Sequence, residues 1–572
     1  MNRIELKLDL TLVLLLSVIF TLKGQEGKPF PTGERVELFT DRTLYIAGEQ
    51  ILLSAFLQSG TGSSQTDLSR VLYYELITPD GNKLTGNKYI IRSSCAFGYL
   101  AIPNDVVTGI YFLRAYTKFM RNWGPYNYHY TTIKIVNANR SEVQSVRSNN
   151  NISEGVDFEE YFEETGESFR ILPDKSQYSP RDTVHISIEG TDSTHYSWKG
   201  LTLAVVPEFS IPENKVKLPE SGQFKKSAFY YPETRGLSIT GKLTDNTTGN
   251  SLPGTTVNLS IIGRGRDFMA MQTDTSGRFF FSLPDYTGFR DLFLCTKNTE
   301  AAEPKILVDN DYCTIPVQIP SKIFTLTQQE REASLNMAVN VQLESYFRDD
   351  SVPEAVNNQN EDQAFYGKPS EILYIDNYVH LPSLEEYFTE VLALAKVRMR
   401  NGKKYFKVLG PQSGITDLDP LTLVYLVAID NPSLVLAISP ANISRIEVVN
   451  QIYVKGDQTY GGIINIISKR GDFAGIDLPS SGVFINYGFL ADSSHYPRKN
   501  KPIQHFPDAR NTLCWEPKVV LDKSNTAKIT FTTSDTPGKY QIILNGINSK
   551  GKTIRQTLPI EVIKKQMSQT IK

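Results

Sequence analysis

The chain has 572 residues and a formal net charge of −2, and no basic block stands out, so its charge argues against a nucleic-acid-binding protein. Apolar residues make up 40% and charged residues 21%, which predicts globular cores rather than disorder. At about 150 residues per domain, the length predicts roughly four domains. The 29 Tyr and 29 Phe, together with frequent turn residues, favour a mainly β fold.

The first residues have the pattern of a secretory signal peptide, which we place at 1–24. Arg3 and Lys7 precede an apolar core at residues 10–22, and this core is too short to cross a membrane comfortably. We therefore expect an exported protein with cleavage near residue 24. Lys23 lies close to that point, which leaves an uncleaved membrane anchor as the alternative.

Four cysteines in an exported chain could form disulfides. Cys295 and Cys313 are near enough in the sequence to form one bridge, whereas Cys95 and Cys514 lie in different expected modules. The sequence leaves two alternatives open, a disulfide between Cys295 and Cys313 or buried thiols.

Three segments have the short strands and regular turn signals of β-sandwiches, at 33–138, 168–232 and 508–565. The first two share the pattern D-[KR]-x-x-Y-x-x-[GR], which begins at Asp41 and again at Asp174 and indicates an internal repeat. Two sequence motifs in the first segment resemble MG2-type macroglobulin domains of bacterial α2-macroglobulin relatives, namely DRTLYIAGE and GIYFLRAYTKFMRNWG. The resemblance implies that each of the three segments is a macroglobulin-like sandwich of its own.

Residues 236–320 alternate polar and apolar positions around turn pairs at 253–254 and 276–277. This segment resembles the carboxypeptidase-regulatory-like domain, a small transthyretin-like sandwich without catalytic residues. Five apolar residues then alternate strictly at 335–343, and we expect a strand there. The acidic segment at 149–167 is expected to be a solvated linker, with a cation or partner site as the alternative.

A plug-like α+β module is expected at 366–472. Ser383 and Glu386 form a capping box before apolar residues at helical spacing, which predicts a helix packed on a small sheet. The words ISRIEVV and YGGIINIISKRG resemble the end of the plug domain of TonB-dependent outer-membrane receptors, and we expect the Gly-Gly pair to form a tight turn with positive φ. The residues of this plug-like motif are Arg445, Glu447, Tyr460, Gly461, Gly462 and Asn465.

One stretch matches the phosphate-binding P-loop pattern, GINSKGKT at 546–553. That chemistry needs a helix N-terminus after Thr553, so that backbone N–H groups can bind the phosphate. The residues that follow are strand-like and include a proline, so we expect a polar β-hairpin turn instead. We expect no nucleotide and no other cofactor.

No other constellation in the sequence predicts catalysis or a metal site. His185 and His195 are near each other but lack a third ligand at metal spacing, so surface positions are favoured. Asp376, Asp430 and Glu447 are separated carboxylates, for which we favour positions at strand ends over acid–base catalysis. The thioester motif of the trapping macroglobulins is also missing from the sequence. We therefore expect that the chain is not an enzyme.

Together the resemblances imply an exported, non-enzymatic binding or scaffold protein of the outer-membrane envelope of a Bacteroidetes-type bacterium, located in the periplasm or at the outer membrane. One alternative is a periplasmic accessory of a TonB-dependent uptake system, whose plug-like module docks with an outer-membrane transporter. Another is a macroglobulin-type protease inhibitor that lacks a thioester. A receptor barrel needs ~22 strands of about ten residues, more than the stretch after Arg470 provides, so we expect no transmembrane barrel and an envelope protein as partner.

Overall fold

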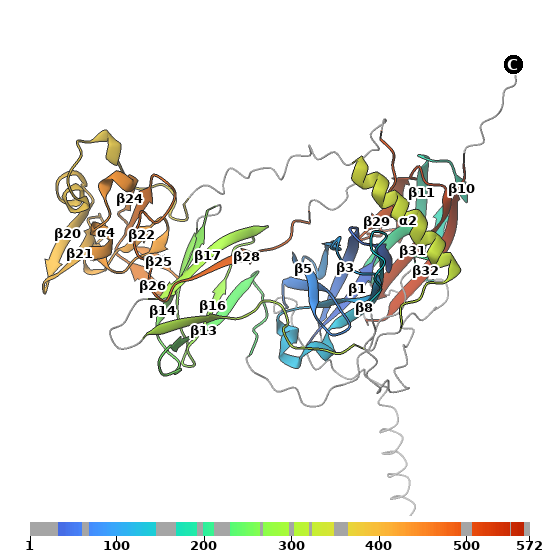
Figure 1. Ribbon diagram of the computed structural model, residues 1–572, viewed down its shortest axis with the longest axis horizontal. Helices are drawn as coiled ribbons and strands as arrows, with labels where there is room; N and C mark the ends of the chain where they lie inside the picture. The colour runs from blue at the N-terminus through green and yellow to red at the C-terminus, as the bar shows by residue number, and fades with distance from the viewer. Residues whose placement is uncertain are drawn as a thin grey trace, which may run out of the picture. The chain divides into compact units, whose positions relative to one another are not determined.

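The computed structural model describes residues 33–59, 68–144, 168–191, 198–210, 229–263, 267–296, 303–319, 323–347, 364–493, 506–548 and 551–564. The expected signal peptide at 1–24 and the acidic segment at 149–167 lie outside these residues. The chain forms two compact units, which we describe separately. Unit 1 comprises Met1–Thr234, Ile315–Arg348 and Ser493–Lys572, and unit 2 comprises Arg235–Thr314 and Asp349–Asp492. The described residues are mainly strands, so the expected fold class is confirmed (Figure 1).

Unit 1 begins with a β-sandwich at residues 33–144, the N-terminal sandwich. Its strands are β1 (Glu34–Thr40), β2 (Leu44–Ile46), β3 (Gln50–Ser59), β4 (Val71–Ile77), β5 (Lys83–Ile90), β6 (Cys95–Ala101), β7 (Gly109–Tyr116) and β8 (His129–Val136). One sheet has the order β1-β3-β6 and the other the order β2-β8-β7-β4-β5. Two short 3-10 helices, η2 (Phe119–Trp123) and η3 (Pro125–Asn127), join β7 to β8.

The second sandwich of unit 1 is assembled from two distant parts of the chain, and we call it the split sandwich. Its strands are β9 (Phe169–Pro173), β10 (Gln177–Tyr178), β11 (Thr183–Gly190), β12 (Trp198–Pro207), β29 (Cys514–Glu516), β30 (Thr526–Thr532), β31 (Gly538–Asn548) and β32 (Thr553–Val562). One sheet has the order β9-β11-β30 and the other β10-β32-β31-β12-β29. In Figure 1, β10 and β11 accordingly lie beside β31 and β32, although the bar colours them from opposite parts of the chain.

The expectation of separate sandwiches at 168–232 and 508–565 is therefore wrong. The central strand β12 pairs along its length with β31, and β11 pairs with β30. One apolar core draws on both parts, with Ile186 and Leu203 from the first and Ile529 and Leu544 from the second. Each part supplies strands to both sheets, but neither part can complete a sheet alone, since β11 would lack its neighbour β30 and β12 its neighbour β31. The need to pair these strand edges and to close one apolar core is the physical reason that the two parts combine.

The two sandwiches of unit 1 share one strand order. When the strands of each are numbered one to eight along the chain, both fold as 1-3-6 and 2-8-7-4-5. In both, the short second strand pairs in parallel with the last strand. The fourth and fifth strands are joined by a turn at residues 78–82 in the N-terminal sandwich, and by residues 208–513 in the split sandwich. The split sandwich is thus the same fold with a long insertion at one turn.

The repeated Asp–Tyr pattern forms the same local structure in both sandwiches. The Tyr45 hydroxyl lies 2.6 Å from Asp41 Oδ1, and the Tyr178 hydroxyl lies 2.8 Å from Asp174 Oδ1. In each case the backbone N–H eleven residues after the Asp donates to the same oxygen, at 3.1 Å and 2.9 Å. The Asp therefore joins its Tyr to the following strand, and the internal repeat inferred from this pattern is confirmed.

The strand expected at 335–343 is wrong, because Gln328–Tyr346 forms the long helix α2 of unit 1. A capping box starts the helix: Glu330 N donates to Thr327 Oγ1 at 3.1 Å, and Thr327 N donates to Glu330 Oε2 at 2.8 Å. The buried residues of α2, namely Ser334, Met337, Ala338 and Asn340, lie on one side of the helix, and Met337 packs against β2. The alternating apolar residues at 335–343 suggested a half-buried strand, but most of them are not buried in the fold.

Unit 2 begins with a smaller β-sandwich, which we call the small sandwich. Its strands are β13 (Ser238–Asp245), β14 (Thr256–Ile262), β15 (Asp267–Gln272), β16 (Arg278–Ser282), β17 (Phe289–Thr296), β18 (Pro304–Val308) and, from much later in the chain, β28 (Val483–Gly488). The sheets have the orders β16-β13-β18 and β15-β14-β17-β28. Cys295 and Cys313 are buried, and no disulfide joins them.

The rest of unit 2 is an α+β module at residues 364–476. Its elements are β19 (Glu371–Tyr374), η5 (Ile375–Asn377), α3 (Leu384–Glu386), a π-helical turn (Tyr387–Val391), β20 (Ala395–Arg400), β21 (Lys403–Val408), η7 (Ile415–Asp417), β22 (Leu421–Val424), β23 (Val427–Ala428), α4 (Pro432–Leu436), η8 (Pro440–Asn442), β24 (Ile443–Val449), β25 (Tyr453–Lys455), β26 (Gln458–Tyr460) and β27 (Ile463–Ser468). The main sheet has the order β19-β24-β27-β22-β23, and β20-β21 and β25-β26 form two hairpins. The cap expected at Ser383 is present, since Glu386 N donates to Ser383 Oγ at 3.4 Å.

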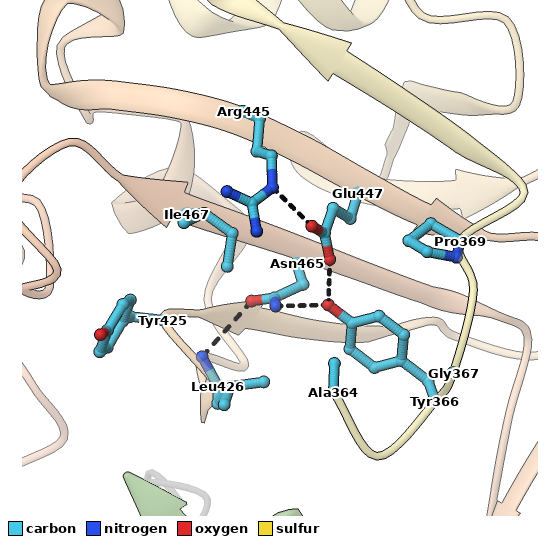
Figure 2. Close-up of a pocket in the computed structure, with 10 residues that line it drawn as sticks. All are labelled: Ala364, Tyr366, Gly367, Pro369, Tyr425, Leu426, Arg445, Glu447, Asn465 and Ile467. Carbon is cyan, nitrogen blue, oxygen red and sulfur yellow. Dashed lines mark hydrogen bonds and ion pairs between the residues drawn. The ribbon is translucent and has the colours of Figure 1, made fainter. Parts of the chain in front are cut away.

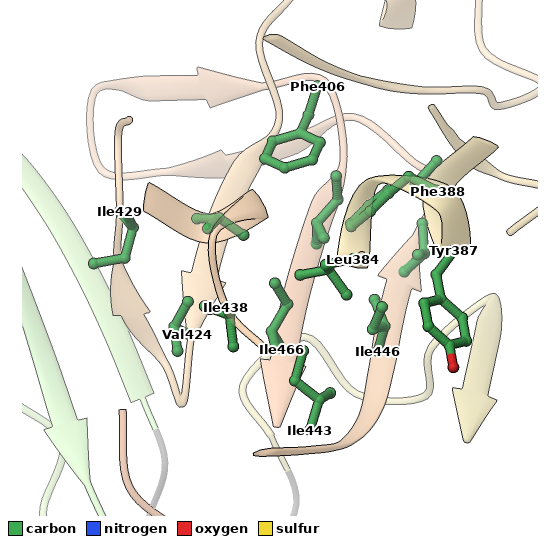
Figure 3. Packing of buried hydrophobic residues seen from close by; sticks show 14 of the residues in the cluster. Leu384, Tyr387, Phe388, Phe406, Val424, Ile429, Ile438, Ile443, Ile446 and Ile466 are labelled. Carbon is green, nitrogen blue, oxygen red and sulfur yellow. The ribbon is translucent and has the colours of Figure 1, made fainter. Parts of the chain in front are cut away.

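The main sheet of the α+β module is covered on both faces by residues of unit 2. On one face Ile446, Ile464 and Ile466 pack against α3, the π-helical turn and α4, as Figure 3 shows for many of these side chains. On the other face Leu423 and Ile463 pack with Phe268 and other residues of the small sandwich. The sheet is therefore a core layer of unit 2, and its cover comes from the neighbouring sandwich of the same chain.

The stretch that matches the P-loop pattern joins β31 to β32, which pair as an antiparallel hairpin, as expected from the sequence. Thr553 begins β32, so no helix N-terminus follows the glycine-rich residues. Asn548 N donates to Lys552 O, and Gly551 N donates to Asn548 O, both at 3.0 Å. The backbone N–H groups of Asn548 and Gly551 thus close the turn rather than point at a phosphate.

Candidate binding pocket in the α+β module

Alternation along β24 and β27 places four side chains of the α+β module on one sheet face. Arg445 lies opposite Ile467 in the antiparallel register, and Glu447 lies opposite Asn465. Side chains on paired antiparallel strands are neighbours. The intervening isoleucines point to the opposite face and its apolar core.

Tyr366, from the segment before β19, joins Glu447 and Asn465 in one hydrogen-bonded network (Figure 2). Its hydroxyl donates to Glu447 Oε2 at 2.5 Å, and Asn465 Nδ2 donates to the hydroxyl oxygen at 2.7 Å. Burial, followed by the negative charge of Glu447, raises the pKa of Tyr366 far above its usual value. The phenol therefore stays protonated and acts as a fixed donor.

Arg445 completes the network and leaves donors unused. Its Nε donates to Glu447 Oε1 at 2.6 Å, and no other hydrogen bond of this guanidinium is made within the described part of the chain. Figure 2 shows its two terminal nitrogens directed away from Glu447, toward the space beside Ile467. Both oxygens of Glu447 are occupied, one by Arg445 and one by Tyr366, so this carboxylate is poorly placed to act as a general base.

The turn between β22 and β23 forms a strained wall of the same site. Tyr425 and Leu426 have φ values of 47° and 70°, and non-glycine residues seldom adopt such values, at about 1–3 kcal/mol each. Three hydrogen bonds hold the turn: Tyr425 N donates to Ile466 O at 2.8 Å, Leu426 N to Asn465 Oδ1 at 3.4 Å, and Ser260 Oγ to Leu426 O at 2.8 Å. The surrounding structure thus fixes a conformation that the turn residues do not favour.

These groups surround a cavity of about 130 Å³. A cavity of this size is several times what one water molecule needs, so it can admit a small organic group. Its polar side is the Arg445–Glu447–Asn465–Tyr366 network, and its remaining walls are mostly apolar. The cavity is lined by Ala364, Tyr366, Gly367, Pro369, Tyr425, Leu426, Arg445, Glu447, Asn465 and Ile467.

The structure brings together three of the six motif residues, namely Arg445, Glu447 and Asn465. Sequence reasoning missed Tyr366 and the turn residues Tyr425 and Leu426. No pattern marks Tyr366, which reaches the sheet from the segment before β19. The positive φ values of the turn have no signal in the sequence either, because neither residue is Gly or Asn.

The other three motif residues, Tyr460, Gly461 and Gly462, lie outside the pocket, where β26 passes into β27. Gly462 has a φ of 95°, as expected for this pair, whereas Gly461 does not have a positive φ. Gly461 is needed for close packing instead, because a Cβ there would lie 2.4 Å from the carbonyl oxygen of Ile415. This junction fixes the start of the strand that carries Asn465.

The other candidate groups of the sequence are placed apart. Asp376 accepts a hydrogen bond from Lys469 at 2.7 Å, and the exposed His185 ring lies 3.1 Å from Thr530 Oγ1. His195 lies outside the described residues. Among those that are described, no group of three or more His, Cys, Asp or Glu side chains is arranged to hold a metal ion. No described helix is both long and apolar enough to cross a membrane.

No protein-family model matches the sequence, and no curated protein matches it either. Comparison with solved structures finds native Escherichia coli alpha-2-macroglobulin, with 12% identity, a TM-score of 0.24, and coverage of 94% of this chain and 40% of that chain. A mutant of Salmonella alpha-2-macroglobulin has 11% identity and a TM-score of 0.23, with coverage of 94% and 40%. Dimeric latent PorU from Porphyromonas gingivalis has 10% identity and a TM-score of 0.15, with coverage of 48% and 34%. The chain thus spans about 40% of the length of the two macroglobulins, and TM-scores this low support no conclusion about its function.

Proposed function

We propose that this chain is an exported, non-enzymatic binding protein of the outer-membrane envelope, and that its α+β module binds a carboxylate group of an envelope protein partner. The observation that carries the proposal is the Arg445 guanidinium. It is held by Glu447 through Nε and turns its terminal nitrogens toward a preformed cavity.

The chemistry of the pocket favours a carboxylate. A guanidinium is planar and presents paired N–H donors that match the two oxygens of a carboxylate. Here its orientation is set before binding, because the Glu447 side chain that holds it is bonded in turn to Tyr366. Preorganised groups lose little conformational freedom on binding. Pro369, Leu426 and Ile467 add apolar walls suited to a short hydrocarbon body behind the carboxylate.

The charge of the pocket favours a carboxylate carried by a larger partner. Arg445 and Glu447 neutralise each other, so the pocket should hold a free small carboxylate only weakly, through the paired N–H donors of Arg445. A C-terminal carboxylate or an acidic side chain of a protein would add contacts outside the pocket. Such a role agrees with a sheet covered on both faces, which supports a fixed docking module rather than a moving transport gate.

The absence of catalysis is part of the proposal. Glu447 is the carboxylate in the pocket, and its oxygens are both engaged. Tyr366 remains a neutral phenol because its pKa is raised by burial and by Glu447. Neither group is therefore available to move a proton near neutral pH.

The test uses 4-fluorobenzoate as a probe and 4-fluorobenzamide, its neutral analogue, as a control. Fluorine NMR line broadening should show 4-fluorobenzoate binding with a Kd on the order of 1 mM, a reasonable affinity for a ligand of about ten atoms. 4-Fluorobenzamide should bind at least tenfold more weakly. Equal binding of the two probes, or of neither, would contradict the proposal.

Variants connect the binding to the pocket. Arg445→Gln removes both the positive charge and the paired N–H donors, whereas Arg445→Lys keeps the charge but loses the paired donors. Both variants should therefore raise the Kd for 4-fluorobenzoate at least tenfold. Arg398→Gln changes an exposed arginine of β20 in the same module and should have no effect. Thermal unfolding of each variant separates a loss of binding from a loss of folding.

A further inference from the structure

One face of helix α2 is fixed to the sandwiches of unit 1. Met337 is 1% exposed, and its carbonyl oxygen accepts a hydrogen bond from Asn511 Nδ2 at 3.2 Å. Asn340 Nδ2 donates to Asn511 Oδ1 at 2.9 Å, and Lys134 Nζ donates to Glu330 Oε1 at 2.6 Å. The helix is therefore held in place, and its other face is presented in a fixed orientation.

That other face carries an apolar stripe. Its residues are Leu335, Val339, Leu343 and Tyr346, which are 62%, 55%, 37% and 83% exposed. They recur at intervals of four, four and three residues, so they lie on one side of the helix. Single exposed apolar residues are common, but four that line one side of a rigid helix indicate an interaction surface.

The stripe is symmetric about Val339. Leu335 precedes Val339 by four residues and Leu343 follows it by four. Glu332 precedes Val339 by seven residues and Tyr346 follows it by seven. An antiparallel pair of such helices related by a two-fold axis at Val339 brings each of these residues to the height of its counterpart.

We propose that α2 forms the contact between two copies of this chain, as an antiparallel helix pair centred on Val339. Leu335 lies beside Leu343 of the second copy, and the two Val339 side chains meet at the axis. The Tyr346 hydroxyl lies at the height of Glu332 of the second copy and donates to its exposed carboxylate. A parallel pair would instead place the two Glu332 carboxylates together, which is unfavourable. The polar groups thus favour a second copy in the antiparallel direction.

A cysteine placed on the axis tests both the contact and its register. In Val339→Cys the two new residues face each other across the helix pair, within the distance that a disulfide can span. Asn336 is also exposed on α2. In Asn336→Cys the two residues are ~9 Å apart along the axis, which is too far for a disulfide. Mild oxidation of the purified chain should therefore link Val339→Cys into a covalent dimer at least tenfold faster than Asn336→Cys.

Light scattering tests the contact without a new cysteine. The purified chain should have twice the mass of a single chain at micromolar concentration. Val339→Glu should weaken the dimer at least tenfold, because it places two like charges at the centre of an apolar contact. At a concentration low enough for both proteins to be monomeric, thermal unfolding of Val339→Glu should match that of the parent, since this side chain is exposed in one copy. A mass of one chain at up to ~100 μM, or equal cross-linking of the two cysteine variants, would overturn the proposal.

Discussion

The junction of β26 and β27 supplies a prediction whose magnitude follows from the structure. A Cβ at Gly461 would lie 2.4 Å from the carbonyl oxygen of Ile415 and 2.6 Å from that of Leu418. Both contacts are with backbone atoms, which cannot turn away as a flexible side chain can. Overpacking of this kind costs about 1–3 kcal/mol. Gly461→Ala should therefore destabilise β27 by about 2 kcal/mol.

Replacing Gly462 costs backbone strain in addition to the steric clash. Its φ of 95° is unfavourable for any residue with a Cβ, and a Cβ there would lie 2.6 Å from Val449 O. Gly462→Ala should be worse than Gly461→Ala by about 1 kcal/mol. Gly402 separates the two effects, because it has a φ of 73° but a Cβ there would have no neighbour within 4 Å. Gly402→Ala therefore carries only the backbone cost, and carries it at the turn between β20 and β21.

Hydrogen exchange of the β27 amides measures these effects locally. A loss of 2 kcal/mol corresponds to about 30-fold faster exchange, since 1.4 kcal/mol is a factor of ten. Gly402→Ala should leave the β27 amides unchanged. All three Trp residues, at 123, 198 and 515, lie in unit 1, so the Trp fluorescence transition should not move in any of the variants. Unchanged β27 exchange in Gly461→Ala, or equal acceleration in Gly402→Ala, would refute the reasoning.

Three further predictions concern the pocket and the split sandwich. Tyr366→Phe removes the donor to Glu447 and should destabilise the α+β module by about 1–3 kcal/mol in hydrogen exchange, whereas Tyr374→Phe at an exposed position should not. A shortened chain tests the split sandwich: residues 168–207 are joined to residues 512–564 by Asn-Gly, which replaces residues 208–511. This chain should fold as one sandwich and unfold in a single cooperative thermal transition. A chain that unfolds without cooperativity would count against the split sandwich. The Arg181 guanidinium holds the pKa of Asp535 below its usual value, so its ion pair stabilises the fold above about pH 4 and is lost as the pH falls further. In Asp535→Asn the free energy of unfolding should therefore fall less steeply as the pH is lowered below about 4. The difference from the parent should be no more than about 1 kcal/mol, because the ion pair is partly exposed. An unchanged pH dependence would contradict the assignment.

Local patterns predicted local structure well. The Asp–Tyr pattern specified the same turn in two sandwiches, because its hydrogen bonds lie within eleven residues. The N-cap at Ser383 also forms where expected, since its hydroxyl accepts a hydrogen bond from Glu386 N. Alternation along β24 correctly places Arg445 and Glu447 on one face and Ile446 on the other. In each case the residues that decide the structure are close together in the sequence.

The failures arose where distant parts of the chain decide the structure. β12 and β31 pair although more than 300 residues separate them, and the sequence of neither strand indicates which strand it pairs with. Helix α2 contains five alternating apolar residues, and one determinant of the helix, the pairing of Asn340 with Asn511, is distant in the sequence. The other determinant, the capping box of Thr327 and Glu330, is local and was a signal in the sequence that the alternation outweighed. The Tyr366 hydroxyl enters the pocket from another segment, so the pocket itself could not be predicted from the motif, although the motif supplies the other three members of the polar network.

The central claim is that the Arg445 pocket binds a carboxylate, and an experimental structure with 4-bromobenzoate tests it most directly. Bromine scatters anomalously, so the probe can be located without reference to the protein. A bromine peak is expected inside the cavity lined by Ile467 and Leu426, with the carboxylate on the terminal nitrogens of Arg445. A pocket that stays empty at saturating probe, or a probe bound only at other sites, would contradict it.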